Sequence, residues 1–193
     1  AATRCPLSFK RIFMLLFLTA QAFCTIFSYS DFHLSKYRQK TACSYSNVLI
    51  KESQENNIDP KLMASLIYVE SGWKKTAVSS ADACGLTQVI PKYTGSGATD
   101  GVKYTCEQLK EPRISIVAGT KILRWWINYH KDKLTEAQKL KMGPDRIRRY
   151  SITRGLCGYN AGFRCSGKKP SRGGMRYAKK VLDTRGKIIQ YFD

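Results

Sequence analysis

One stretch, residues 59–72 (DPKLMASLIYVESG), constrains the fold of this chain more than any other. Asp59, followed by a proline, is suited to cap a helix, and Gly72 is placed to end it. Leu66 and Glu70 stand four residues apart, so they share one face of that helix with the other apolar residues. The stretch therefore predicts a helix that carries a carboxylic acid on its apolar face, in its last turn.

Glu70 is in an unusual place for a purely structural glutamate. An anion near a helix C-terminus meets the negative end of the helix dipole, and burial penalises its charged form. Both effects favour the protonated acid, which is the form that a general acid needs. The alternative is that Glu70 rotates out to water beside Lys74 and Lys75. On the helix alone, the second interpretation is the simpler one.

The motifs that begin with Glu70 favour the catalytic interpretation. Glu70-Ser71 is followed by Ser79, then by Gly85-Leu86-Thr87-Gln88, then by Tyr159-Asn160-Ala161-Gly162, with PRISIVAGTKIL at residues 112–123 in between. In their order and intervals these blocks resemble the catalytic-domain signature of lytic transglycosylases of the goose-lysozyme-like, soluble-transglycosylase type. Each block alone is weak evidence, whereas four in one order are strong.

The resemblance extends from about Cys43 to Tyr191 and implies a mainly α fold of the α+β lysozyme-like kind. We expect one domain over residues 43–193, since the chain is too short for two comfortable ones. Residues 73–100 are rich in Gly, Ser, Ala and Thr and show no sustained helical period. They predict a small irregular loop or sheet region beside the substrate cleft.

The resemblance also implies an activity. Enzymes of this family cleave the β-1,4 bond between N-acetylmuramic acid (MurNAc) and N-acetylglucosamine (GlcNAc) of peptidoglycan and form 1,6-anhydro-MurNAc. Glu70 would be the single catalytic acid and base, and peptidoglycan glycan strands the partner. No cofactor or metal is expected. The expected substrate-binding residues are Ser71, Ser79, Gln88, Tyr159, Asn160 and Tyr177, the last of which opens the final helix. For Ser71 and Asn160, capping or turn formation is an equal alternative, and for Tyr177 a place in the core.

Two other functions stay open at this stage. A hydrolytic muramidase (lysozyme) needs a second carboxylate, and Asp82 is the acid in the loop that could supply it, although stabilising its own turn is the simpler role. A non-catalytic basic protein that binds the cell envelope is the other alternative. Thr87 stands where relatives often carry Met, which would weaken one apolar contact to the sugar.

The net charge is strongly positive, because 33 Lys and Arg stand against 14 Asp and Glu. Such a field favours polyanions such as anionic wall polymer or lipid headgroups. The basic residues are scattered and no nucleic-acid-binding motif is present, so we expect no nucleic-acid partner. Residues 131–149 depart from the family pattern as an insertion. They carry Arg146, Arg148 and Arg149, which with Arg154 form either a solvated face or a contact to wall polymer or membrane headgroups.

Residues 1–30 resemble an export signal or an N-terminal membrane anchor, since three basic residues precede an apolar run from 12 to 27. Small residues before Asp31 predict cleavage there. We expect the protein in the periplasm or cell envelope, anchored to the inner membrane through residues 12–27 if the leader stays. The polar residues 31–42 predict a linker. Wall remodelling, a secretion or conjugation machine and a phage assembly all fit as settings.

Cysteine usage supports export, because an oxidising compartment allows disulfides. The expected pairs are Cys84–Cys106, which would staple the Gly85–Gln88 loop, and Cys157–Cys165, which would close a short loop at the Tyr159–Gly162 block. Cys43 would be left over. Buried free thiols are the alternative.

Amphipathic patterns predict further helices over residues 45–57, 116–129 with Ser115 as cap, and 175–191. In the insertion, Thr135 is expected to cap a helix that Gly143-Pro144 breaks. Trp125 and Trp126 predict one core and one half-exposed ring. His130 is expected on the surface.

Overall fold

The computed structural model describes residues 21–192. The basic residues and most of the apolar run of the predicted leader lie in residues 1–20, outside this part. Residues 21–26 are helical, and the later elements are η1 (Ser30–Phe32), α2 (Lys36–Glu55), α3 (Pro60–Ser71), η2 (Pro91–Tyr93), η3 (Gly97–Thr99), α4 (Cys106–Lys110), α5 (Pro112–Asp132), α6 (Glu136–Ala161), η4 (Gly162–Cys165) and α7 (Arg172–Ile189). The predicted mainly α fold is confirmed.

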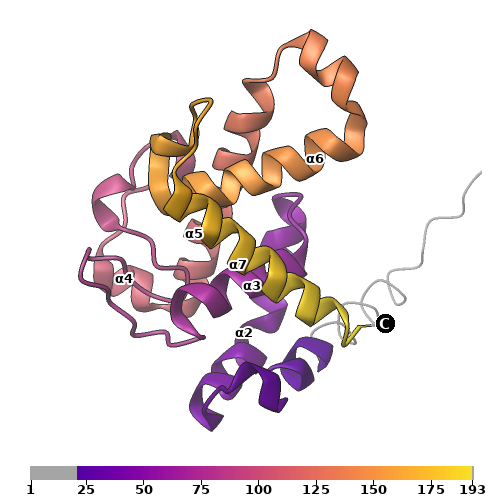
Figure 1. Ribbon diagram of the computed structural model, residues 1–193. Helices are drawn as coiled ribbons and strands as arrows, with labels where there is room; N and C mark the ends of the chain where they lie inside the picture. Colours follow the sequence, from indigo (N-terminus) through magenta and orange to yellow (C-terminus); the bar gives the residue numbers. More distant parts are fainter. Residues whose placement is uncertain (1–20, 193) are drawn as a thin grey trace, which may run out of the picture.

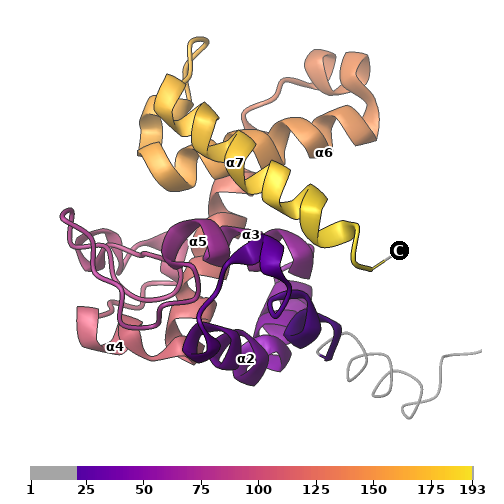
Figure 2. The ribbon, with the colours of Figure 1, turned by 60° about the horizontal axis from the view of Figure 1, so that its bottom comes forward.

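Helix α3 is the central element and lies between α2 and α7 (Figure 1 and Figure 2). Its boundaries are those that the sequence predicted. The Asp59 carboxylate accepts a hydrogen bond of 2.9 Å from the Lys61 backbone N–H, and Gly72 ends the helix in the left-handed conformation with φ 53°. All residues from Leu62 to Ile67 are buried. The start of α3 is thus set by its cap, and its position is set by the burial of its apolar face.

Helices α5, α6 and α7 pack in sequence on one another, and small residues let α5 and α6 approach closely. A Cβ atom on Gly158 would lie 2.5 Å from the Trp126 ring, and one on Gly155 would lie 2.6 Å from the Ile127 side chain. Trp126 is 8% exposed, while Trp125 is half-buried, as the sequence predicted. His130 is only 2% exposed, so the predicted surface position is wrong. It lies beside Trp126 on the face of α5 that packs inward.

The insertion forms the first part of α6. The Thr135 hydroxyl caps the helix together with Gln138, and Gly143 interrupts it with φ 69° and ψ 166° just before Pro144. This confirms the predicted cap and break. Figure 1 shows the resulting bend as an arm that leaves the body of the molecule, and the second part of α6 leads back to the body.

The N-terminal part differs from the sequence prediction. Residues 31–42 are no linker, because α2 begins at Lys36 and Phe32 is 1% exposed. Phe23, Ile26 and Phe27 are buried in the main core. The apolar residues before Asp31 therefore pack onto the domain. The sequence pattern instead predicts a leader followed by a linker.

Two other helices begin earlier than predicted. Helix α5 starts at Pro112, which takes the first helical position, so Ser115 lies inside the helix and does not cap it. Helix α7 starts at Arg172, where the Ser171 hydroxyl accepts a hydrogen bond from the Gly174 N–H, and it continues through Gly186. Within residues 21–192, no helix is both long and apolar enough to cross a membrane.

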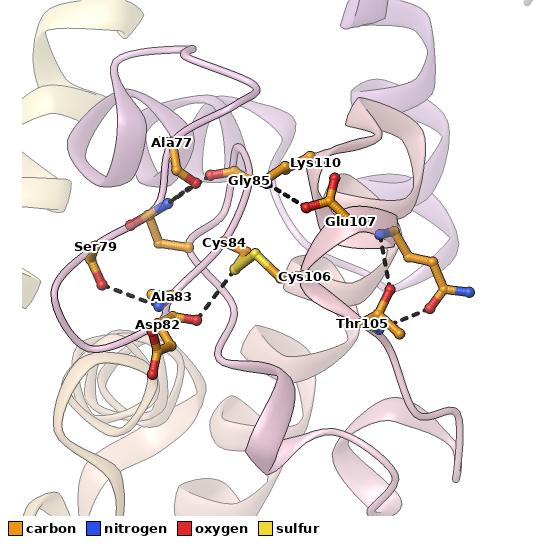
Figure 3. The surroundings of a disulfide bond; sticks show 12 residues. Ala77, Ser79, Asp82, Ala83, Cys84, Gly85, Thr105, Cys106, Glu107 and Lys110 are labelled. Carbon is orange, nitrogen blue, oxygen red and sulfur yellow. Dashed lines mark hydrogen bonds and ion pairs between the residues drawn. A yellow bond between two sulfur atoms is a disulfide. The ribbon is translucent and has the colours of Figure 1, made fainter.

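Residues 73–105 form the expected irregular region. Its ordered backbone pairs are the isolated bridges Val78–Cys84 and Cys84–Val89, with η2 and η3 further on. A small second core of Cys84, Val89, Leu109 and Ala118 holds this region on α4 and α5. The predicted disulfide Cys84–Cys106 joins it to the start of α4 (Figure 3).

Candidate active site

Glu70 is half-buried in the last turn of α3. Burial raises the pKa of its carboxyl to about 7, although the Tyr177 hydrogen bond and the charge of Lys180 act in the opposite direction. The protonated form of Glu70 is therefore accessible near neutral pH. The physical environment that the sequence predicted for this residue is present.

Tyr177 contacts the acid directly. Its hydroxyl, on the second turn of α7, donates a hydrogen bond of 2.6 Å to Oε1 of Glu70. Burial and the neighbouring charge of Glu70 raise the pKa of Tyr177 well above its ordinary value, so the phenol keeps its proton and acts as a donor. Since Oε1 accepts this bond, the proton of neutral Glu70 is directed to Oε2.

Tyr159 holds the Gly85–Gln88 loop at the site. Its hydroxyl donates a 2.7 Å hydrogen bond to the backbone carbonyl of Thr87. Burial and the charge of Glu70 raise the pKa of Tyr159 well above its ordinary value. The α6 block and the Gly85–Gln88 loop, which are far apart in the sequence, therefore meet beside the acid.

Thr87 anchors the same loop from below. Its side chain is fully buried, and its hydroxyl lies 2.8 Å from the Ser115 carbonyl oxygen, to which it donates. The Ser115 hydroxyl in turn accepts from the Thr87 N–H at 3.1 Å. Gly119, one turn further along α5, lies so close that a Cβ atom there would be 2.5 Å from the Thr87 side chain. The Thr87 side chain thus faces α5.

Three residues expected to bind substrate use their polar groups to build the loop. The Ser71 hydroxyl donates to the Leu86 carbonyl at 2.8 Å, and Gln88 Nε2 donates to the Gly85 and Ala77 carbonyls at 3.0 and 3.2 Å. Ser79 Oγ accepts from the backbone N–H of Ala83 at 3.1 Å, as Figure 3 shows. These bonds hold the segment after α3 in one shape.

Asn160 and Asp82 have exposed side chains. Asn160 directly follows Tyr159, so it lies next to the residue that contacts the loop, and no hydrogen bond of its side chain occurs within residues 21–192. Asp82 has the left-handed backbone angle φ 59°, and its N–H donates to the Ser79 carbonyl at 3.1 Å. The turn role suggested for Asp82 therefore matches its backbone.

Both predicted disulfides are present. Cys157–Cys165 closes η4 against α6, and the Sγ atoms of both cysteines lie within 3 Å of where a Cβ of Gly174 would stand, so α7 packs directly on this disulfide. Cys43, expected to be left over, pairs with Cys24. The sequence interpretation placed Cys24 in a leader, which hid this partner.

Sequence reasoning missed Lys180 and Ser115 at the site. Lys180 is exposed and follows Tyr177 by one helical turn, a spacing that places both on one face of α7. The sequence pattern predicts Ser115 as a helix cap, whereas it lies inside α5. Among the described residues no group of three His, Cys, Asp or Glu side chains is arranged to hold a metal ion.

Fold and site together define a helical domain with one half-buried, partly protonated carboxyl at the end of its central helix. A family model, the transglycosylase SLT domain, matches residues 47–181. The chain belongs to this family, and the resemblance drawn from its motifs is confirmed. Membership assigns it a lytic transglycosylase type of activity on peptidoglycan.

Proposed function

We propose that this protein cleaves the β-1,4 bond between MurNAc and GlcNAc and releases 1,6-anhydro-MurNAc ends, with Glu70 as the single acid and base. The observation that carries the proposal is the pairing of a Glu70 pKa near 7 with a neutral tyrosine donor on Oε1. An acid with a pKa near the working pH both gives and takes a proton efficiently.

The first step is protonation of the bridging oxygen. Glu70 Oε2 gives its proton to that oxygen, the C1–O bond breaks, and GlcNAc leaves as the alcohol. The N-acetyl carbonyl oxygen of MurNAc supports the positive charge at C1. Tyr177 holds the new carboxylate in place, because a hydrogen bond to the charged form stabilises it.

The second step closes the ring. The Glu70 carboxylate takes the proton of the MurNAc 6-hydroxyl, and O6 bonds to C1, so no water is consumed and Glu70 returns to its protonated state. Lys180, whose charge favours ionised Glu70, stabilises the intermediate stage.

A single acid is consistent with the electrostatics of the site. Two-carboxylate glycosidases place their acids about 5–9.5 Å apart, a separation at which a second charge would raise the pKa of the first. Among the described residues, the pKa of Glu70 is shifted by burial, by the Tyr177 hydrogen bond and by the charge of Lys180. No carboxylate is among these influences. This supports the transglycosylase over the muramidase that would use Asp82.

The test is to digest purified peptidoglycan with the full chain and to weigh the products by mass spectrometry. Anhydro-muropeptides, lighter than reducing muropeptides by one water, are expected from the wild type. The Glu70→Gln variant is expected to fold and to lose activity by about 100- to 10,000-fold. Reducing ends would show hydrolysis and overturn the proposal, as would near-normal activity of Glu70→Gln.

A further inference from the structure

A concave surface lies away from Glu70, and the proposed chemistry does not use it. This groove has a volume of about 1240 Å³ and is bounded by the α2–α3 corner, α5, the later part of α6 and the end of α7. Leu62 lines it at the start of α3. At 1.5 Å per helical residue, Leu62 lies about 12 Å from Glu70 along the helix axis. On α7 the groove is lined by Arg185, whereas Tyr177, about two turns earlier, contacts Glu70. The groove and the acid are therefore separated along both helices.

The groove has an apolar floor and a cationic rim. Ile58, Leu62 and Ile127 form the buried part of the floor, at 5%, 2% and 8% exposure. The rim cations are Arg124, Lys131, Arg148 and Arg149. Arg124 is half-buried and the other three are exposed, so their charges are accessible to a ligand.

Few acids balance this charge. Arg185 forms an ion pair with Asp59 at 2.5 Å, which neutralises both. Asp145 is the other acid that lines the groove. Within residues 21–192 no ion pair involves a rim cation. The groove is therefore a site of positive potential with low-dielectric walls, which concentrates anions.

The insertion contributes one wall of the groove. The break at Gly143 and Pro144 turns the chain so that the following residues of α6, including Arg148 and Arg149, face α5 and α7 across the gap. Two members of the basic cluster that the sequence suggested as a surface face, Arg148 and Arg149, thus line one wall of a hollow. A flat lipid surface fits a hollow poorly, whereas a branch projecting from a polymer fits it well.

We propose that this groove binds the carboxylates of peptidoglycan stem peptides and forms a second wall-binding site outside the cleft. This rests on the proposed function, since it takes peptidoglycan as the substrate. Stem peptides are short, carry carboxylates and present small apolar side chains, which match a cationic rim over an apolar floor. The site holds the enzyme on the polymer while the cleft exchanges product for substrate.

The test measures binding of the full chain to purified peptidoglycan sacculi by co-sedimentation over a range of NaCl concentrations. The Glu70→Gln background prevents digestion. The groove variant is Arg148→Gln/Arg149→Gln. The matched control is Lys36→Gln/Lys40→Gln, which removes the same charge from exposed positions at the start of α2, at the other end of the molecule from the α6 arm (Figure 2).

We expect the groove variant to bind about five- to tenfold more weakly at low salt, with a shallower salt dependence, because two exposed charge contacts are lost. The control should change less than about twofold. Sacculi whose carboxylates have been amidated should bind the parent and the groove variant equally.

Equal binding of the groove variant and the control would overturn the proposal. So would a difference between the parent and the groove variant that stays the same on amidated sacculi. If the groove variant lost binding to phosphatidylglycerol vesicles but bound sacculi as the parent does, the groove would be assigned to lipid headgroups instead. Failure of the proposed function is separate: it would appear as absence of anhydro product with intact Glu70, whatever the groove variant binds.

Discussion

Residue scale: the proposed chemistry of the site depends on one hydrogen bond between α7 and α3. Burial raises the pKa of Glu70 by more than the Tyr177 hydrogen bond lowers it, and the resulting pKa is about 7. In the proposed mechanism Glu70 must be protonated to start the reaction, so kcat/KM should fall as pH rises through about 7.

Replacing Tyr177 by Phe removes the donor that favours ionised Glu70, so the pKa of Glu70 should rise. The alkaline limb of the kcat/KM profile should then move to higher pH, while the maximum rate falls by about tenfold or more, because the stabilised carboxylate intermediate is lost. A pH series on soluble glycan strands measures both effects. An unchanged limb with a lower rate would mean that Tyr177 serves only packing.

Element scale: the active-site loop is held by its contacts to helix α5. Gly119 allows the loop to approach, because a Cβ at this position would lie 2.5 Å from Thr87. Gly119→Ala in an α-helix is favourable by propensity, by about 1 kcal/mol. It should nevertheless displace Thr87 and, through its carbonyl, the Tyr159 hydrogen bond.

We therefore expect Gly119→Ala to lower activity by about tenfold or more and to destabilise the domain by about 1–3 kcal/mol, in spite of its better helix propensity. Urea unfolding and the product assay measure the two. Gly186→Ala, on α7 in open space, is the matched control and should be stabilised or unchanged. Normal activity of Gly119→Ala would show that the loop adapts.

At this scale the sequence predicts what local signals determine. The caps of α3 and α6 and the break at Gly143 are encoded by neighbouring residues, and their positions are confirmed. The contact of Tyr177 with Glu70 joins residues far apart in the chain. The family resemblance suggested only that Tyr177 faces the cleft, and it did not predict this hydrogen bond. The uses of Ser71 and Gln88 were not predictable, because a hydroxyl or amide suits a sugar and a backbone carbonyl equally.

Whole-molecule scale: the domain includes residues that composition assigned to a leader. Phe27 packs edge-to-face on Trp73 with ring centroids 5.2 Å apart, next to the turn that follows Glu70. Phe23 packs on Phe192 in the same manner at 5.1 Å, and Cys24 is bonded to Cys43. The N-terminal segment thus packs against both early and late parts of the chain. A pattern of charge and hydropathy cannot distinguish such a segment from an export signal.

Deletion of residues 1–30 should therefore cost much of the stability of the domain. Three buried apolar side chains contribute about 1.5–3 kcal/mol each and the Cys24–Cys43 disulfide about 2–4 kcal/mol, against a typical total of about 5–15 kcal/mol. Deletion of residues 1–20 removes none of these contacts. Thermal unfolding of the two deletions, with full-length Cys24→Ser/Cys43→Ser as a control for the disulfide alone, compares them. Equal melting temperatures would show that residues 21–30 are dispensable. A large difference would require any processing of the leader to occur before Phe23 and not before Asp31.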